Sequence, residues 1–146
     1  MSKLSIVRNY SVKTVLDAWA ILAYLQREEP AASRVRVVLK EAATHHVTLF
    51  ASLINVGEVF YRIGRRKGEQ AAEETLQELQ HLPLTIVSPK PQTVMQAARL
   101  KIHYSLSYAD AFAVVTAQDV HGTLLTGDPE LLQLKGIVAI EKLRRH

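Results

Sequence analysis

The sequence predicts an α/β fold: a three-layer αβα sandwich with a central, mainly parallel sheet of about five strands. Short, apolar, β-branched segments alternate with longer segments of helical periodicity along the whole chain. This order requires crossover connections, which place helices on both faces of a parallel sheet. The expected strands cover residues 13–16, 47–50, 84–87, 123–126 and 137–140.

The expected helices lie between these strands and cover residues 19–25, 30–45, 52–62, 69–81, 91–100 and 108–120. Ser52 and Ser107 are suitable N-caps. The segment 64–68, Gly-Arg-Arg-Lys-Gly, predicts a basic turn that ends the helix before it. The last helix is apolar nearly all round, which predicts a central position, and Gly122 is expected to end it.

Length and composition indicate one domain over residues 1–146, with a loose arm at 1–12 and a basic tail at 142–146 that is expected to fray. The chain has no cysteine, which excludes disulfides, zinc–thiolate sites and thiol nucleophiles. No apolar run approaches the ~18 residues of a membrane span, so we expect a cytoplasmic protein without a membrane partner. The net charge of +4 permits an anionic partner such as nucleic acid.

Four acids are expected to meet at one edge of the sheet. Asp17 closes the first strand and Asp128 follows the fourth, and ligands of open parallel sheets bind beyond such strand ends. A strand order that switches direction near the first strand places these two loops side by side. Asp110 lies in the first turn of its helix, and Glu58 lies about two turns into the helix after the second strand.

Carboxylates gathered in one cleft repel one another, and a divalent cation removes that repulsion. Oxygen ligands without cysteine favour a hard ion, Mg²⁺ or Mn²⁺. Such an ion activates water and stabilises the charge that develops on a phosphate. The acidic set therefore predicts metal-dependent phosphate chemistry.

Each acid also has an ordinary structural interpretation. Asp17 can simply terminate a strand, and Glu58 can form an ion pair with Arg62 four residues later. Asp110 can interact with a helix dipole, and Asp128 can cap the helix that follows it. The expected placement of all four at one edge favours the functional interpretation.

At these acids the chain resembles the PIN-domain family, especially VapC-type toxins of bacterial toxin–antitoxin pairs. The resemblance extends over about residues 13–140, and its matching segments are 15–17 (VLD), 52–59 (SLINVGEV), 107–113 (SYADAFA) and 125–131 (LTGDPEL). One departure is at Ala18-Trp19, where many relatives carry a polar residue.

The resemblance implies an αβα sandwich and Mg²⁺ or Mn²⁺ held by Asp17, Glu58, Asp110 and Asp128 as metal and catalytic residues. Thr126 matches the family's hydroxyl residue two positions before the last acid, which orients an acid or a water. Family members cleave RNA, are inhibited by a cognate antitoxin and often form homodimers. Glu130 is a further acid beside this set, with a solvated helix start as its ordinary interpretation.

Basic residues follow the helix that carries Glu58, and they are candidates for binding RNA phosphates: Arg62, Arg65, Arg66 and Lys67. A solvated cluster of charges is the alternative.

Three functions are consistent with these observations. The first is a metal-dependent endoribonuclease, the toxin of a toxin–antitoxin pair. The second is a catalytically inactive PIN-like module that binds RNA or protein. The third is a receiver-type phosphoacceptor domain, which would need paired acids after the first strand, where this chain has only Asp17.

Overall fold

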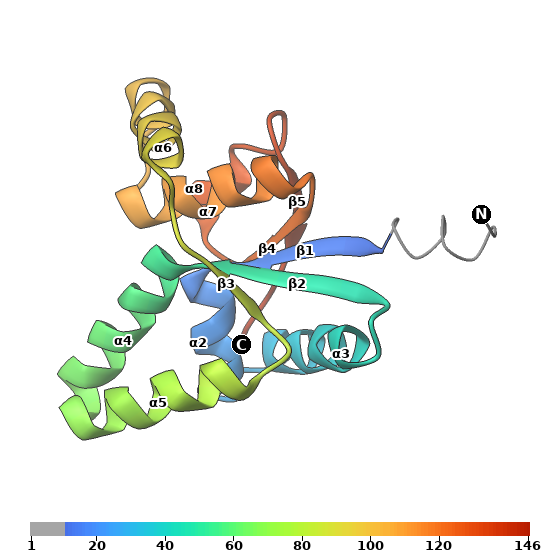
Figure 1. The fold of residues 1–146 in the computed structure, drawn as a ribbon, viewed down its shortest axis with the longest axis vertical. Helices are drawn as coiled ribbons and strands as arrows, with labels where there is room; N and C mark the ends of the chain where they lie inside the picture. Colours follow the sequence, from blue (N-terminus) through green and yellow to red (C-terminus); the bar gives the residue numbers. More distant parts are fainter. Residues whose placement is uncertain (1–10) are drawn as a thin grey trace.

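The sheet is parallel and five-stranded, as the sequence predicted, in a computed structural model that describes residues 11–146 (Figure 1). Its strands are β1 (Val12–Leu16), β2 (Val47–Ser52), β3 (Thr85–Val87), β4 (Thr123–Thr126) and β5 (Ala139–Lys142). Most of the arm expected over residues 1–12 lies outside the described residues, and Val12 already belongs to β1.

The strand order β3-β2-β1-β4-β5 places β1 at the centre, where the direction of strand addition reverses. A reversal of this kind opens a crevice at the carboxyl ends of the two central strands. In the β1–β4 register Leu16 lies opposite Leu125, so Asp17 and Thr126 follow as neighbours at that edge. The strand order that brings the Asp17 and Asp128 loops together is thereby confirmed.

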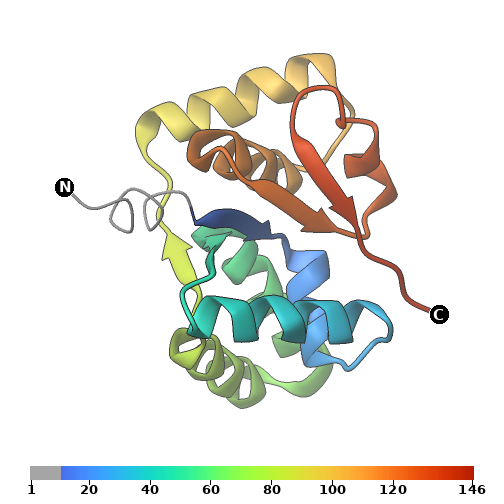
Figure 2. The ribbon, with the colours of Figure 1, turned by 90° about the vertical axis from the view of Figure 1, so that its right-hand side faces the viewer.

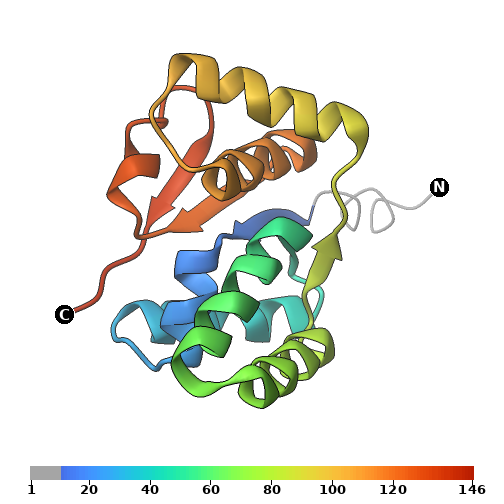
Figure 3. The same ribbon diagram turned by 90° about the vertical axis from the view of Figure 1, so that its left-hand side faces the viewer.

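Helices cover both faces of the sheet, which confirms the sandwich (Figures 2 and 3). They are α2 (Ala18–Leu25), α3 (Ala31–Ala43), α4 (Leu53–Lys67), α5 (Glu69–His81), α6 (Pro91–His103), α7 (Tyr108–Val120) and the short α8 (Pro129–Leu132). Adjacent strand residues serve opposite layers. Leu16 and Leu125 pack with α2 to α5, whereas Val15 and Leu124 pack with α6 to α8.

Helix α7 is central, as its apolar composition predicted. Every residue from Asp110 to Ala117 is buried, and the Thr116 hydroxyl is satisfied by the Phe112 carbonyl at 2.7 Å. The left-handed residue that ends the helix is His121 (φ 56°), one position before the expected Gly122. Gly122 is nevertheless required, since a Cβ there would lie 2.8 Å from the Lys13 carbonyl oxygen.

The basic turn expected over residues 64–68 is wrong, because α4 continues to Lys67 and ends only at Gly68 (φ 97°). Gly64 stays helical because α5 folds back against α4 there, and Ala72 lies 3.5 Å from where a Gly64 Cβ would be. The basic residues occupy the last turn, where cations interact favourably with the helix dipole.

The C-terminal tail does not fray, contrary to the sequence-based expectation. Strand β5 lies two residues later than predicted, and the Leu143 side chain after it is buried. The Leu143 N–H donates to the Thr126 carbonyl at 2.8 Å, and the Arg144 carbonyl accepts from the Ala31 N–H at 2.8 Å. The tail, which runs on beyond the end of β5 in Figure 2, is therefore fixed to the end of β4 and to the start of α3.

Among the described residues, no helix has both the length and the apolar character needed to cross a membrane.

Candidate active site

Three carboxylates converge at the carboxyl edge of β1 and β4. One carboxylate oxygen from each of Asp110, Asp128 and Glu130 lies within 4.8 Å of the other two. Asp128 follows β4 and caps α8, and Asp110 lies in the first turn of α7. Elements far apart in the sequence thus bring acids to one point of the crevice.

Asp17 lies behind this group and is 1% exposed. Its Oδ1 accepts from the Ala20 N–H at 2.8 Å and caps α2, while its Oδ2 accepts from the Thr126 hydroxyl. The pKa of Asp17 is raised to about 7, mainly by burial and to a smaller extent by the charges of Asp110 and Asp128, against the lowering effect of the two hydrogen bonds. Asp17 is therefore a helix cap whose buried carboxyl lies near enough to Asp110 and Asp128 to interact with them electrostatically, outside the group of three converging carboxylates.

Asp110 is 9% exposed, and its N–H donates to the Ser107 Oγ at 3.1 Å. The pKa of Asp110 is raised to about 7, first by burial and then by the neighbouring Asp128 and Glu58 carboxylates, while the hydrogen bond with Ser107 lowers it. The protein therefore holds neighbouring carboxyls in positions where ionisation of one opposes ionisation of the next.

Thr126 links two of the acids and is completely buried. Its hydroxyl donates to Asp17 and accepts from the Asp128 N–H at 3.0 Å. Both hydrogen-bonding capacities of the hydroxyl are used within the protein. The side chain fixes the two acidic loops relative to each other.

Glu58 and Glu130 differ in their surroundings. Glu58 accepts from the Arg62 Nε at 2.9 Å, so the ion pair considered as its ordinary interpretation exists, yet Glu58 also lines the cleft. Glu130 is exposed, as its ordinary interpretation required, but its carboxylate joins Asp110 and Asp128. Its position two residues after Asp128, at the start of a helix, is the signal in the sequence that supports Glu130 as a site residue.

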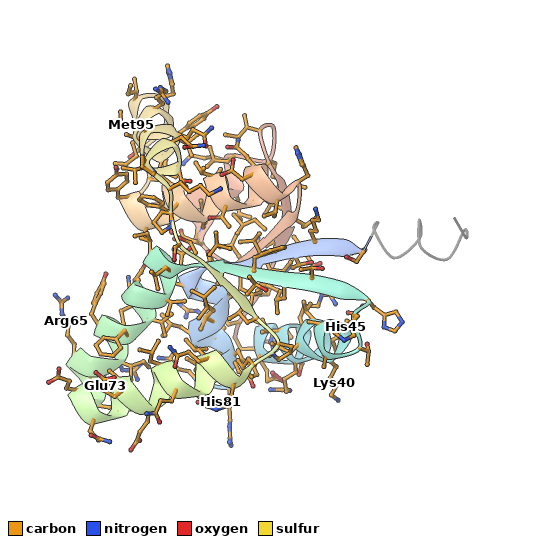
Figure 4. All side chains as sticks on the ribbon, viewed as in Figure 1. Lys40, His45, Arg65, Glu73, His81 and Met95 are labelled. Carbon is orange, nitrogen blue, oxygen red and sulfur yellow. The ribbon has the colours of Figure 1, made fainter. Side chains whose placement is uncertain are left out.

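A cleft of about 530 Å³ opens above the acids. It is lined by three of the carboxylates, Glu58, Asp110 and Asp128, and by four arginines, Arg62, Arg65, Arg66 and Arg145. Arg65 extends from α4 with its guanidinium 5.0 Å from the Tyr61 ring centre (Figure 4). Three of the four basic residues predicted for phosphate binding thus line the cleft, and Lys67 is not among its lining residues.

Two residues near the site were not predicted from the sequence, one that supports the first turn of α7 and one that lines the cleft. Asn55 is buried on α4, donates from Nδ2 to the Ala109 carbonyl at 3.0 Å and thereby joins α4 to the first turn of α7. Its position three residues before Glu58, on the same helix face, could have indicated this. Arg145 reaches the cleft from the tail, and no local pattern indicates it.

The cleft wall contains Trp19. A Cβ at Gly127 would overlap the six-membered ring of the Trp19 indole, so only glycine permits this close approach. The departure from the family pattern at Ala18-Trp19 is therefore accommodated by Gly127 beside Asp128.

Solved structures of low sequence identity share the fold. VapBC2 from Rickettsia felis, bound to a DNA fragment from its promoter, has a TM-score of 0.71 and 14% identity over 91% of this chain and 100% of that one. VapC20 from Mycobacterium tuberculosis, a toxin that cleaves the sarcin–ricin loop, has a TM-score of 0.67 and 13% identity over 82% of this chain and 93% of that one. FitAcB from Neisseria gonorrhoeae has a TM-score of 0.63 and 15% identity over 87% of this chain and 95% of that one.

A comparison with curated proteins finds no relative. The family model for the PIN domain matches residues 14–137, a stretch that contains all the acids of the cleft. This match disfavours the receiver-type interpretation, which shares only the general αβα architecture. The chain belongs to the PIN-domain family.

Proposed function

We propose that this protein is a metal-dependent endoribonuclease and the toxin of a toxin–antitoxin pair. The observation that carries the proposal is the convergence of carboxylate oxygens of Asp110, Asp128 and Glu130 within 4.8 Å beside buried Asp17, where Asp110 and Asp128 also line a cleft rich in arginine. Clustered acids suit a cation, and arginines suit an anionic polymer. A phosphodiester substrate satisfies both halves of the cleft.

The donor set fits Mg²⁺ or Mn²⁺. Every candidate ligand is a carboxylate oxygen, and the chain has no thiolate to favour a softer ion. Burial, with repulsion between the carboxylates as a smaller cause, raises the pKa values of Asp17 and Asp110, and a divalent cation would stabilise their ionised forms. We assign the metal to Asp17, Glu58, Asp110 and Asp128, and the proximity of the Glu130 carboxylate to Asp110 and Asp128 supports Glu130 as a further ligand.

The ion, when bound, activates a water molecule and neutralises charge on the phosphate. The side chains of the protein hold the acids in position. Ser107 fixes the first turn that carries Asp110, and Thr126 holds Asp17 against the Asp128 loop. Arg62, Arg65 and Arg66 neutralise phosphates along the RNA strand. Direct attack by water is expected to leave a 3′-hydroxyl end.

Solved relatives support the toxin role and the choice of RNA. The Rickettsia felis and Salmonella typhimurium structures are VapBC complexes bound to DNA, and the Klebsiella pneumoniae structure is a toxin–antitoxin complex. The Mycobacterium tuberculosis relative cleaves an RNA loop. By analogy, we assign this chain an RNA substrate and a cognate antitoxin partner.

Besides the complex with an antitoxin, we expect the protein to form a homodimer. Large apolar side chains remain exposed where α4 and α7 begin and along α6, at Leu53, Tyr108, Met95 and Ile102. Helix α7 contacts both α4 and α6, so the apolar residues lie on neighbouring segments. Light scattering of the purified protein is expected to give twice the chain mass, and Ile102→Glu is expected to reduce it to the mass of one chain.

Cleavage of a labelled single-stranded RNA by the purified protein tests the proposed activity. We expect cleavage with Mg²⁺ or Mn²⁺, loss of cleavage with excess EDTA, and recovery when the metal is restored. Products should carry 3′-hydroxyl ends that a poly(A) polymerase extends. RNA binding without cleavage under any of these conditions would contradict the nuclease proposal and favour the inactive binding module.

Thr126→Val is expected to lower both stability and RNA cleavage, whereas Thr126→Ser keeps both close to wild type. Valine fills similar space but has no hydroxyl, so the Asp17 carboxylate and the Asp128 N–H each lose a partner. Leaving such buried groups unpaired costs roughly 1–3 kcal/mol each. Thermal unfolding and cleavage rates measured on both variants check this, and equal behaviour of the two would mean that the hydroxyl is dispensable.

A further inference from the structure

The wall of the cleft that faces the acids is completed by the C-terminal segment. After β5, the backbone is fixed by the Leu143 bond to Thr126 and by the Arg144 bond to Ala31, and the His146 N–H donates to the Glu29 carbonyl at 3.1 Å. A β-bridge joins Arg145 to Pro30. Both sides of Arg145 are thus anchored, and its side chain lines the cleft.

The Arg145 guanidinium is held by two neighbours of different character. Its Nη1 donates to Glu28 at 3.2 Å, and its carbon Cζ lies 5.1 Å from the Trp19 ring centre. Trp19 in turn packs on Gly127, directly before Asp128. One aromatic ring therefore separates the arginine from the acidic floor.

Glu28 also connects this arginine to a second one. When the Gln26 amide is oriented to satisfy its neighbours, its nitrogen donates to Glu28 at 3.0 Å and its oxygen accepts from Arg66. Arg66 belongs to the last turn of α4, far from the tail in sequence. The tail and α4 thus present two guanidinium groups on one polar network at the cleft.

We propose that Arg145 is a substrate contact, binding an RNA phosphate beside the one that is cleaved, with Glu28 and Trp19 as its positioning residues. This inference depends on the proposed nuclease function. The Arg145 side chain lines the cleft and stays 49% exposed while its Nη1 is paired with Glu28. A guanidinium binds phosphate through two parallel hydrogen bonds, and an exposed ion pair such as that with Glu28 is weak enough to share or exchange the arginine.

Steady-state cleavage of a labelled single-stranded RNA with Mn²⁺, measured from about 50 to 200 mM KCl, tests this role. Arg145→Gln is expected to raise KM about tenfold and to leave kcat within about twofold, because a contact shared by ground and transition state is removed. The slope of log KM against log salt should fall by about 0.7, the value for one phosphate of a single strand.

Two further variants, together with the melting temperature of each variant, distinguish a contact of Arg145 with substrate from a purely structural role. Arg144→Gln removes the same charge from an exposed neighbour and should change neither KM nor the salt slope. Arg145→Lys should restore the salt slope but only part of the affinity, since lysine cannot bind phosphate in the bidentate manner.

The outcomes distinguish this inference from the function on which it depends. If Arg145→Gln lowers the melting temperature and kcat with an unchanged salt slope, Arg145 only secures the tail and the inference fails. An equal effect of Arg144→Gln would also overturn it. A wild-type protein that neither cleaves RNA nor binds it in a salt-dependent manner would instead refute the proposed function itself.

Discussion

Asp110→Asn is expected to lower RNA cleavage by about 10²–10³-fold or more while the fold stays intact. The substitution keeps the size of the side chain but replaces one acceptor oxygen with an amide donor, and it removes one of the converging carboxylates. The cleft then loses both a metal ligand and a charge that balances the ion. Initial rates on a single-stranded RNA at saturating Mn²⁺ measure the effect.

Asp119→Asn is the matched control, because Asp119 lies exposed on the same helix α7 and outside the cleft. It should cleave RNA like wild type. Without metal at pH 8, Asp110→Asn should melt at a higher temperature than wild type, since it removes a buried charge that its neighbours repel. A variant that is inactive because it is unfolded, or one that retains full activity, would contradict this account of Asp110.

The metal-free protein is expected to lose stability as pH rises from about 4 to about 7, and Mg²⁺ should restore it. In the folded protein Asp17 keeps its proton up to its pKa of about 7, whereas in the unfolded chain it ionises near 3.8. A raised folded pKa gives stability that is full below the unfolded value and is lost through this window. The loss is on the order of a few kcal/mol, because one pKa unit corresponds to about 1.4 kcal/mol.

Melting temperatures at pH 5, 6, 7 and 8, each with EDTA and with Mg²⁺, measure this effect. The ion binds the ionised carboxylates, so its stabilisation should be larger at pH 8 than at pH 5. The ion pair of Glu141 with Arg34 acts in the opposite direction and at lower pH, because it holds the pKa of Glu141 below its usual range. A metal-induced shift that is the same at pH 5 and pH 8 would argue against the acids as ligands.

The fold and the location of the acids could be predicted because both depend on regular patterns. Alternating strands and helices imply a parallel sheet, and such a sheet with β1 at its centre necessarily places Asp17 and Asp128 on adjacent loops. The nearly all-apolar helix α7 had to be central, which carried Asp110 into the crevice. These inferences needed no information about individual side-chain contacts.

What could not be predicted depends on contacts between distant segments. Gly64 looks like a helix breaker in the sequence, and only its packing on Ala72 of α5 shows why the helix continues. The tail looked free in the sequence because its backbone partners are distant along the chain. Ala31 lies more than a hundred residues before Arg144, and Thr126 lies about twenty residues before Leu143. Arg145 therefore had no local signal, although it completes the cleft.

Glu130 illustrates the same limit within the site. Its exposure was anticipated, but exposure does not exclude a place in the acidic cluster, because the short helix α8 turns it toward Asp110. The distance between Glu130 and Asp110, not the burial of Glu130, decides whether the two carboxylates can bind the same metal ion. The spacing of residues in the sequence does not give that distance.

Calorimetric titration with Mn²⁺ at pH 7.5 tests the central claim, that the clustered acids form a divalent-metal site. We expect saturable binding by the wild-type protein, proton release into the buffer, and at least tenfold weaker binding by Asp110→Asn, with Asp119→Asn unchanged. Absence of saturable binding, or equal affinity in wild type and Asp110→Asn, would contradict the account.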